Sequence, residues 1–297
     1  MYFPYLYARG EEANAIATIA ESRIGSSSII PIIDNSFDGT NLDSSKKMVG
    51  KLIENMRKFI LFVNDETELD KYEKEHGNIF YDYCILGGKN YFINNNKFKY
   101  EAILYEQNVN FVDDSKILYH IFSSENSWLI QPFSNEYGTS KVVVLFDAFK
   151  IWEPNINYPN QDLFKNSGIC FTYKKMKFAG FGDYTILSKG FSASSGGNAA
   201  TITHVIHLTK KSKNEDNSDC IVTRHFLTSR EEEEDISTRS NKTLKKVVEH
   251  KSEFLNSKGL QEIENILNTR GSTSLGMYKR IGIIHHLELM DWIMKNM

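Results

Sequence analysis

The fold of this chain is decided by YFPYLYARGEEANAIATIAE at residues 2–21, followed by IIPIID at 29–34 and FILFV at 59–63. YFPYL, IIPII and FILFV are short apolar runs of the kind that form buried strands. The segments between them place apolar residues at helical spacing, as in Met48, Leu52, Ile53 and Met56. The alternation β-α-β-α-β predicts a parallel sheet with helices packed outside it.

Further apolar runs continue this pattern along the chain. We expect strands at 83–86, 102–105, 128–130, 142–146, 184–187, 205–208 and 221–226, and helices around 244–255 and 287–294. This succession predicts one α/β domain over residues 1–297, a (β/α)8 TIM-like barrel with an irregular segment at 151–219 and C-terminal helices. A doubly wound open sheet is the alternative, and the lack of GxGxxG after the first strand argues against its dinucleotide-binding form.

Composition narrows the class of protein. The chain has 297 residues, and 35 Lys+Arg against 38 Asp+Glu give a net charge of -3, which argues against a protein that coats nucleic acid. Its 3 cysteines form no CxxC pair, so a reducing cytoplasm is the expected compartment. The apolar runs hold about five residues, whereas a membrane helix needs ~20, so we expect a soluble protein without a membrane partner.

Polar residues follow several predicted strands. In a parallel barrel, side chains just past the carboxyl ends of the strands gather at one mouth, where active sites form. The candidates for catalysis there are Arg9, Glu11, Asp34, Asp147 and Asp183. Acids around an arginine would suit acid–base chemistry on a phosphate-bearing ligand, or a divalent metal. Helix capping is the alternative role of such residues, and no motif specifies a metal or a cofactor.

The segment SASSGGNAATIT, residues 192–203, has the most unusual composition in the chain. Its Gly196 and Gly197 would leave backbone N–H groups open to a phosphate, although the lysine of a P-loop is missing. We expect residues 192–198 to form a mobile lid or phosphate-facing loop beside the mouth, with a plain surface connection as the alternative.

Histidines supply the remaining candidates. His207 and His225 lie in two strand-like segments, and one histidine from each strand would face a common pocket. The alternative is that both are structural and hydrogen-bonded, since their spacing matches no metal motif. We expect His285 and His286, at the last helix, to lie on the surface.

Several segments in order along the chain resemble the bacterial and phage Beta protein family. They are YFPYLYARGEEANAIATIAES (2–22), SSSIIPIID (26–34), KVVVLFDAFKIWEPNINYP (141–159), KFAGFGDYTILSKGFS (177–192), SGGNAATITHVIHLT (195–209) and TRHFLTS (223–229). The resemblance covers residues 1 to about 230 and implies a barrel of the (β/α)8 kind.

The resemblance also suggests a role. Some members of the family lie in mobile-element and phage-defence gene neighbourhoods, beside a predicted nuclease. The resemblance therefore implies an anti-phage defence component that acts with a partner protein such as a co-encoded nuclease. The alternative is an enzyme acting on phosphate esters through the acids, Arg9 and the glycine-rich segment, and binding of nucleic acid through this chain alone is the least favoured role.

Overall fold

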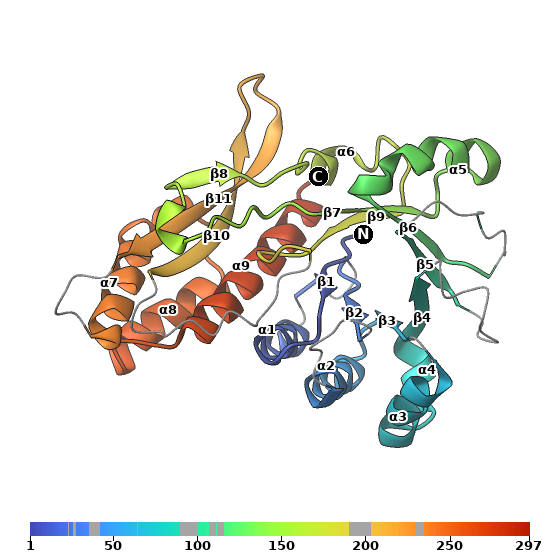
Figure 1. Cartoon of the computed structure of the whole chain (residues 1–297), viewed down its shortest axis with the longest axis horizontal. Helices are drawn as coiled ribbons and strands as arrows, with labels where there is room; N and C mark the ends of the chain where they lie inside the picture. The colour runs from blue at the N-terminus through green and yellow to red at the C-terminus, as the bar shows by residue number, and fades with distance from the viewer. Residues whose placement is uncertain are drawn as a thin grey trace.

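The computed structural model describes residues 1–22, 24–25, 28–35, 42–63, 65–89, 100–106, 111, 116–189, 203–229 and 235–297. An eight-stranded parallel sheet, in the order β1-β2-β3-β4-β5-β6-β7-β9, curves into a nearly closed barrel (Figure 1). Its strands are β1 Tyr5–Leu6, β2 Ile32–Asp34, β3 Phe59–Phe62, β4 Cys84–Lys89, β5 Ala102–Tyr105, β6 Tyr119–Ser123, β7 Val142–Phe146 and β9 Gly180–Asp183.

The amino-terminal residues bring the two edges of this sheet together. Phe3 N–H donates to Phe181 O at 2.9 Å, and Phe181 N–H donates to Met1 O at 3.1 Å. Side chains at positions 180 and 182 of β9 would block this approach. A Cβ at Gly180 would lie 2.2 Å from the carbonyl oxygen of Met1, and a Cβ at Gly182 would lie 2.2 Å from that of Phe3. The two glycines of β9 are therefore required where the barrel closes.

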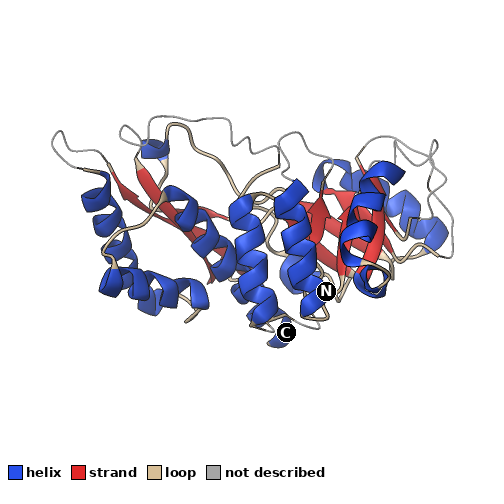
Figure 2. Ribbon diagram, turned by 90° about the horizontal axis from the view of Figure 1, so that it is seen from below, coloured by secondary structure: helices blue, strands red, loops and turns tan. Residues whose placement is uncertain are grey.

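Helices cover the outside of the barrel, as the view from below shows (Figure 2). α1 packs between α2 and α9, so the first and the last helix of the chain lie side by side. Side-chain oxygens start two of these helices, since Asp65 accepts from Glu68 N at 2.9 Å and Ser274 accepts from Met277 N at 3.3 Å. The outer helices are α1 Gly10–Glu21, α2 Leu42–Glu54, α3 Glu66–His76, α4 Ile79–Tyr83, η2 Ser124–Leu129, α5 Ile130–Tyr137 and α9 Leu275–Lys295.

The strands bury both faces, which explains their continuous apolar runs. Alternate residues point into the barrel, where they form one apolar cluster with Phe3, Ile32, Leu104 and Leu145. The residues between them, such as Leu6 and Ile33, pack against the helices. Side chains that share the barrel interior therefore lie two positions apart along a strand. This spacing decides which polar residues point into the mouth.

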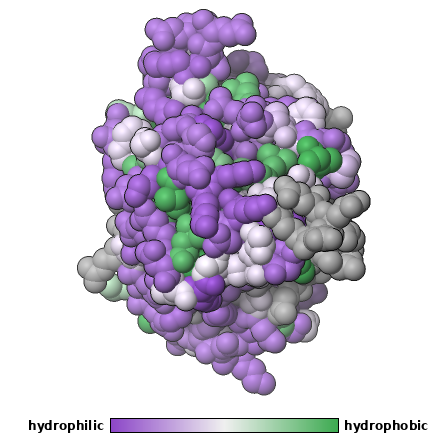
Figure 3. Space-filling view, turned by 90° about the vertical axis from the view of Figure 1, so that its left-hand side faces the viewer, coloured by the Kyte–Doolittle hydropathy of each residue, from purple (hydrophilic) through white to green (hydrophobic). Residues whose placement is uncertain are grey.

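A second unit is built largely between β9 and α9 (Figure 1). Its antiparallel sheet has the order β10-β11-β8, and the amphipathic helices α7 and α8 bury Leu244, Val247 and Ile263 against it. The side of the molecule formed by this unit is mostly hydrophilic, with small separate apolar spots (Figure 3). Its elements, with the two short helices before β9, are η3 Asn155–Asn157, β8 Gln161–Leu163, α6 Ile169–Thr172, β10 His204–Lys213, β11 Asp219–Thr228, α7 Ile236–Glu249, η4 Lys251–Glu253 and α8 Lys258–Thr269.

Several sequence predictions differ from the structure. The segment 151–219, predicted to be irregular, contains η3, β8, α6, β9 and all of β10. The strand predicted at 128–130 is wrong, because these residues end η2 and begin α5, while the strand of this region is β6. The prediction that His285 and His286 lie on the surface is also wrong: both are fully buried, because α9 packs against α1 on one side and β10 on another.

Within the residue ranges that the structure describes, no helix combines the length and apolar character needed to cross a bilayer. All three cysteines, Cys84, Cys170 and Cys220, are buried free thiols.

Candidate functional site

The interior of the barrel becomes polar at the carboxyl ends of its strands. Asp34 ends β2 and points inward, where it accepts a hydrogen bond from the Tyr5 hydroxyl at 2.5 Å. Lys89 ends β4 and places its Nζ 3.1 Å from the same Asp34 oxygen. The side chains of Asp34 and Lys89 are only 1% and 12% exposed, so this ion pair lies inside the mouth. Burial, and then the charge of Asp34, raises the pKa of Tyr5 well above its usual range.

Aromatic and acidic side chains continue around the same mouth. The ring of Tyr184, just after β9, lies 4.9 Å from that of Tyr5 and stacks on that of Tyr7 at 6.0 Å. Burial and the nearby Tyr7, Glu106 and Asp147 raise the pKa of Tyr184. The negative charges of Asp34, Glu106 and Asp147 therefore all act on the buried hydroxyl of Tyr184.

Asp147 follows β7 at an inward position, two residues after Leu145. It is partly buried, and its Oδ1 accepts no hydrogen bond from the residues that the structure describes. Burial raises the pKa of Asp147, and the charge of Glu125 adds to this effect. A carboxyl group with a raised pKa is better able to exchange protons near neutral pH, which is what general acid–base chemistry requires.

Arg9 stands at the start of α1, with its guanidinium 5.5 Å from the centre of the Tyr7 ring. The acidic residue that holds this turn is Glu12, whose carboxylate accepts from Tyr7 N at 3.2 Å and from Arg9 N at 3.0 Å. Burial raises the pKa of Glu12. The predicted candidate Glu11 lies beside Gly276 of α9 and is partly exposed, so it sits at the rim outside the barrel interior.

The backbone is strained where two strands reach the mouth. Ala8 after β1 has φ 54° and Thr185 after β9 has φ 58°, both in the left-handed region that costs a side-chain-bearing residue about 1 kcal/mol or more. Such strain is concentrated at sites where the chain must aim a side chain. Here the strained residues flank Arg9 and Tyr184.

Asp183 takes a different direction from the other predicted acids. Its backbone lies at the carboxyl end of β9, but its side chain points outward to the helical layer. There it accepts from the Tyr2 hydroxyl at 2.7 Å and from Thr185 N at 2.8 Å, and it lies 3.3 Å from His286 Nε2. Asp183 and His286 are fully buried. The structure therefore brings Asp34 and Asp147 together in the mouth and separates Asp183 from them.

His207 and His225 lie directly opposite each other on β10 and β11, with their Nδ1 atoms 2.7 Å apart. His225 Nε2 is 3.1 Å from Asp162 Oδ1, on β8. The two rings are packed against Phe149 and Tyr158, whose ring centres lie 4.8 Å and 4.7 Å from that of His207.

His207 lines a cavity of about 230 Å³ beside the mouth. The cavity wall includes Phe149, two residues after Asp147, and Ile186, two residues after Tyr184. Lys279 of α9 is exposed at its rim, and desolvation of its amine together with the charge of Arg9 lowers the pKa of Lys279. The mouth and the cavity are thus neighbouring parts of one polar region.

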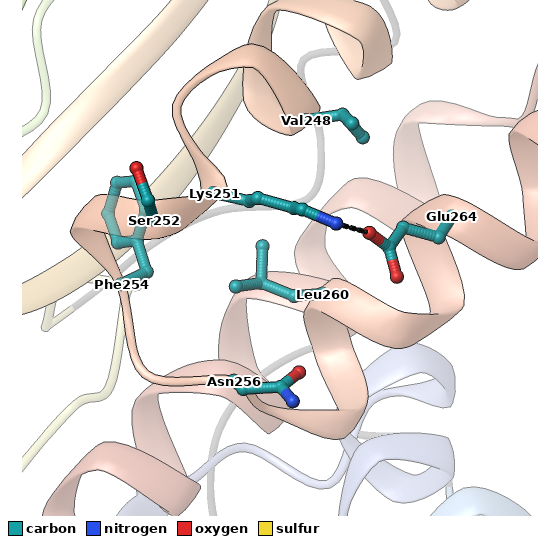
Figure 4. Close-up of a pocket in the computed structure, with 7 residues that line it drawn as sticks. All are labelled: Val248, Lys251, Ser252, Phe254, Asn256, Leu260 and Glu264. Carbon is teal, nitrogen blue, oxygen red and sulfur yellow. Dashed lines mark hydrogen bonds and ion pairs between the residues drawn. The ribbon is translucent and has the colours of Figure 1, made fainter.

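A separate hollow of about 290 Å³ lies within the second unit, between η4 and α8 (Figure 4). The ion pair of Lys251 with Glu264, at 2.5 Å, crosses it, and Val248, Phe254 and Leu260 supply apolar walls. The ammonium group of Lys251 in this hollow is therefore paired with the carboxylate of Glu264.

Gly196 and Gly197, with the expected lid at 192–198, lie outside the described residues. Among the residues with described positions, no group of three or more His, Cys, Asp or Glu side chains is placed to hold a metal ion.

Four residues of this region were not predicted from the sequence. Lys89, Glu12, Asp162 and Lys279 each act on a predicted residue: Lys89 on Asp34, Glu12 and Lys279 on Arg9, and Asp162 on His225. For Glu12, the four-residue pattern Arg9 to Glu12 at a helix start offered a signal, because an acid at the third helical position caps the turn. The others are brought in by strand pairing and helix packing, which leave no local pattern.

Comparison with known proteins gives no relative: no protein-family model matches the chain, and no curated protein sequence matches it.

Proposed function

We propose that this chain is a barrel protein of the Beta family type that acts in anti-phage defence beside a partner protein such as a co-encoded nuclease, and that its mouth acts on a phosphate ester. One observation carries the proposal. The segments that resemble the family are scattered over more than two hundred residues, yet their described parts lie on β7, β9, β1 and β2, which are consecutive around the barrel, and on β10 and β11 beside them.

This convergence gives the resembling segments a shared location. They supply Arg9, Asp34, Asp147, His207 and His225, all at or beside the mouth. Segments that only stabilised the fold would be distributed around the whole barrel. Their concentration on one wall favours a functional surface.

The chemistry available at this wall suits hydrolysis of a phosphate ester. Arg9 and Lys279 supply positive charge for the phosphate oxygens. Asp147 takes the proton of an attacking water, a bond forms between the water oxygen and phosphorus, and the bond from phosphorus to the ester oxygen breaks. The released alkoxide takes up a proton and leaves as the alcohol.

The test combines hydrolysis with protection from phage. Purified chain is assayed on bis(p-nitrophenyl) phosphate, and cells carrying the chain with its neighbouring gene are challenged with phage. Asp147→Asn is expected to lower hydrolysis by about a hundredfold or more, as loss of a general base does, and to lower protection with it. Asp70→Asn on the exposed face of α3 is the matched control and should change neither. Full protection by Asp147→Asn, with a wild-type melting temperature, would contradict catalysis at this mouth.

A further inference from the structure

Four polar side chains form a continuous chain that ends at the cavity beside the mouth. Trp152 Nε1–H donates to Asp162 Oδ2 at 2.9 Å, and Asp162 Oδ1 lies 3.1 Å from His225 Nε2. His225 Nδ1 in turn lies 2.7 Å from His207 Nδ1. The His225 side chain is 0% exposed and that of Asp162 is 17% exposed, so this chain of contacts is shielded from water along most of its length.

The direction of each hydrogen bond follows from what each group can donate. A carboxylate only accepts, so the Nε2 of His225 that faces Asp162 carries a proton. With that single proton on the His225 ring, its Nδ1 is a lone pair, and the proton between the two rings belongs to Nδ1 of His207. This leaves the lone pair of His207 on Nε2, in the way that a buried carboxylate fixes the tautomer of a histidine.

The surroundings of His207 keep this ring neutral. Burial, and then the proximity of His225 and Lys279, lowers the pKa of His207 well below its usual range. Phe149 and Tyr158 hold the ring between them. In the part of the chain that the structure describes, Nε2 of His207 makes no hydrogen bond, whereas its Nδ1 is satisfied by His225.

The cavity combines apolar walls with several polar groups. Ile186, Leu187 and Val205 are apolar, His207 offers an acceptor, and Lys279 brings positive charge to the rim. Glu153 and Asn155 also line the cavity, so a negatively charged ligand group has to face Lys279 and avoid the carboxylate of Glu153. A volume of about 230 Å³ has room for a ring of six atoms with small substituents.

We propose that this cavity is a ligand site in which Nε2 of His207, aimed by Asp162 through His225, accepts a proton or a hydrogen bond from a small planar ligand. The ligand carries a hydroxyl or N–H group toward His207 and a negative charge toward Lys279. The site does not depend on the hydrolysis proposed for the mouth, and Asp147 takes no part in it.

The first test reads the tautomers directly. ¹⁵N NMR of the histidine-labelled full chain at neutral pH should show a protonated Nδ1 on His207 and a protonated Nε2 on His225, with His207→Gln and His225→Gln giving the assignments. Asp162→Asn should mix the two tautomers of His225, because an amide also donates. Trp152→Phe leaves the carboxylate in place and should preserve them. A proton on Nε2 of His207 in the wild-type chain would overturn the proposal.

The second test uses three related probes that share one six-membered ring. At millimolar concentration, 4-hydroxybenzoate should shift the Nε2 resonance of His207 more than benzoate, which lacks the hydroxyl, and more than phenol, which lacks the carboxylate. Lys279→Met at the exposed rim should weaken 4-hydroxybenzoate about tenfold, the effect of losing one charge-assisted contact, and leave phenol unchanged. Equal shifts from benzoate and 4-hydroxybenzoate, or no shift of His207 with any probe, would overturn the ligand class.

Discussion

His286 Nε2 lies 3.3 Å from both carboxylate oxygens of Asp183, and neither side chain is exposed to solvent. The contact joins the last helix, α9, to β9, the strand at which the barrel closes. The Tyr2 hydroxyl donates to the same carboxylate at 2.7 Å, so the amino-terminal strand segment is held at this point too. Asp183 thus has a structural role at the seam, while the acids of the mouth keep their side chains inside the barrel.

Replacing Asp183 should therefore destabilise the whole barrel. Asp183→Ala is expected to lower the free energy of unfolding by about 3 kcal/mol, because the buried donors on Tyr2 and Thr185 lose their acceptor. Urea unfolding followed by circular dichroism measures this. Asp70→Ala, on the exposed face of α3, is the control and should keep the wild-type midpoint. Equal midpoints for the two variants would refute the role of Asp183 at the seam.

The ion pair inside the mouth should show strong coupling. Lys89→Met is expected to cost about 3 kcal/mol, because it leaves the carboxylate of Asp34 buried without its ammonium. In Lys89→Met with Asp34→Asn, the loss should be smaller than the sum of the single losses by about 1–3 kcal/mol. A double-mutant cycle on chemical unfolding gives this difference. Additive losses would mean that the two groups do not interact in solution.

Stability should fall between pH 6.5 and pH 4 in a way that depends on His120. Burial, and then the charge of Lys141, lowers the pKa of His120 from 6.5 to about 4. As the pH falls through this window, the unfolded chain takes up a proton that the folded chain refuses, so stability present above pH 6.5 is lost toward pH 4. The loss from this group alone is about 3 kcal/mol.

His120→Gln tests this pH dependence, because a glutamine oxygen can still accept from the Tyr105 hydroxyl that lies 3.0 Å from His120 Nδ1. Unfolding free energies at pH 7 and pH 4.5 should differ less for His120→Gln than for the wild type. Carboxyl groups such as Glu12 contribute to both proteins, so the comparison cancels their contributions. The raised pKa of Glu12 makes stability increase as the pH falls, which is opposite to the effect of His120. Parallel pH profiles for the two proteins would show that His120 does not titrate as described.

Glu12 and Glu11 should differ sharply although they are neighbours. Glu12→Ala leaves the backbone N–H groups of Tyr7 and Arg9 without their acceptor and is expected to cost about 1–2 kcal/mol. Glu11→Ala removes only a partly exposed side chain and should cost much less; among the residues with described positions, its one hydrogen bond comes from Asn14 and is 3.4 Å long. Thermal unfolding of the two variants in parallel decides between them. A larger loss for Glu11→Ala would contradict the assignment.

Much of the barrel could be predicted because its strands are continuous apolar runs. Ala102–Tyr105 and Val142–Phe146 were predicted with their observed bounds, since a strand buried on both faces needs no alternation. β9 was missed for the opposite reason. Glycine weakens a strand pattern, and Gly180 and Gly182 are present because the amino-terminal backbone approaches them too closely for a side chain.

The site could be predicted only as far as direction follows from strand position. Asp34 and Asp147 lie two residues beyond inward-facing side chains, so their place in the mouth follows from strand periodicity. The same rule assigns Asp183 to the outer face once the bounds of β9 are known. Asp162 could not be found, because its contact with His225 depends on the pairing of β8 with β11, over sixty residues apart in sequence.

That pairing also determines how this architecture can be taken apart. β8 leaves the barrel wall after β7, joins the antiparallel sheet as its edge beside β11, and is followed by β9, back in the barrel. The second unit is therefore no detachable module: excising residues 204–274 would strip β8 of its neighbour and expose Phe164 and Ile186, while expressing them alone would leave β11 with an open edge. An exchange of the second unit between proteins would therefore have to carry β8 as well as residues 204–274, two stretches of the gene separated by the codons of β9.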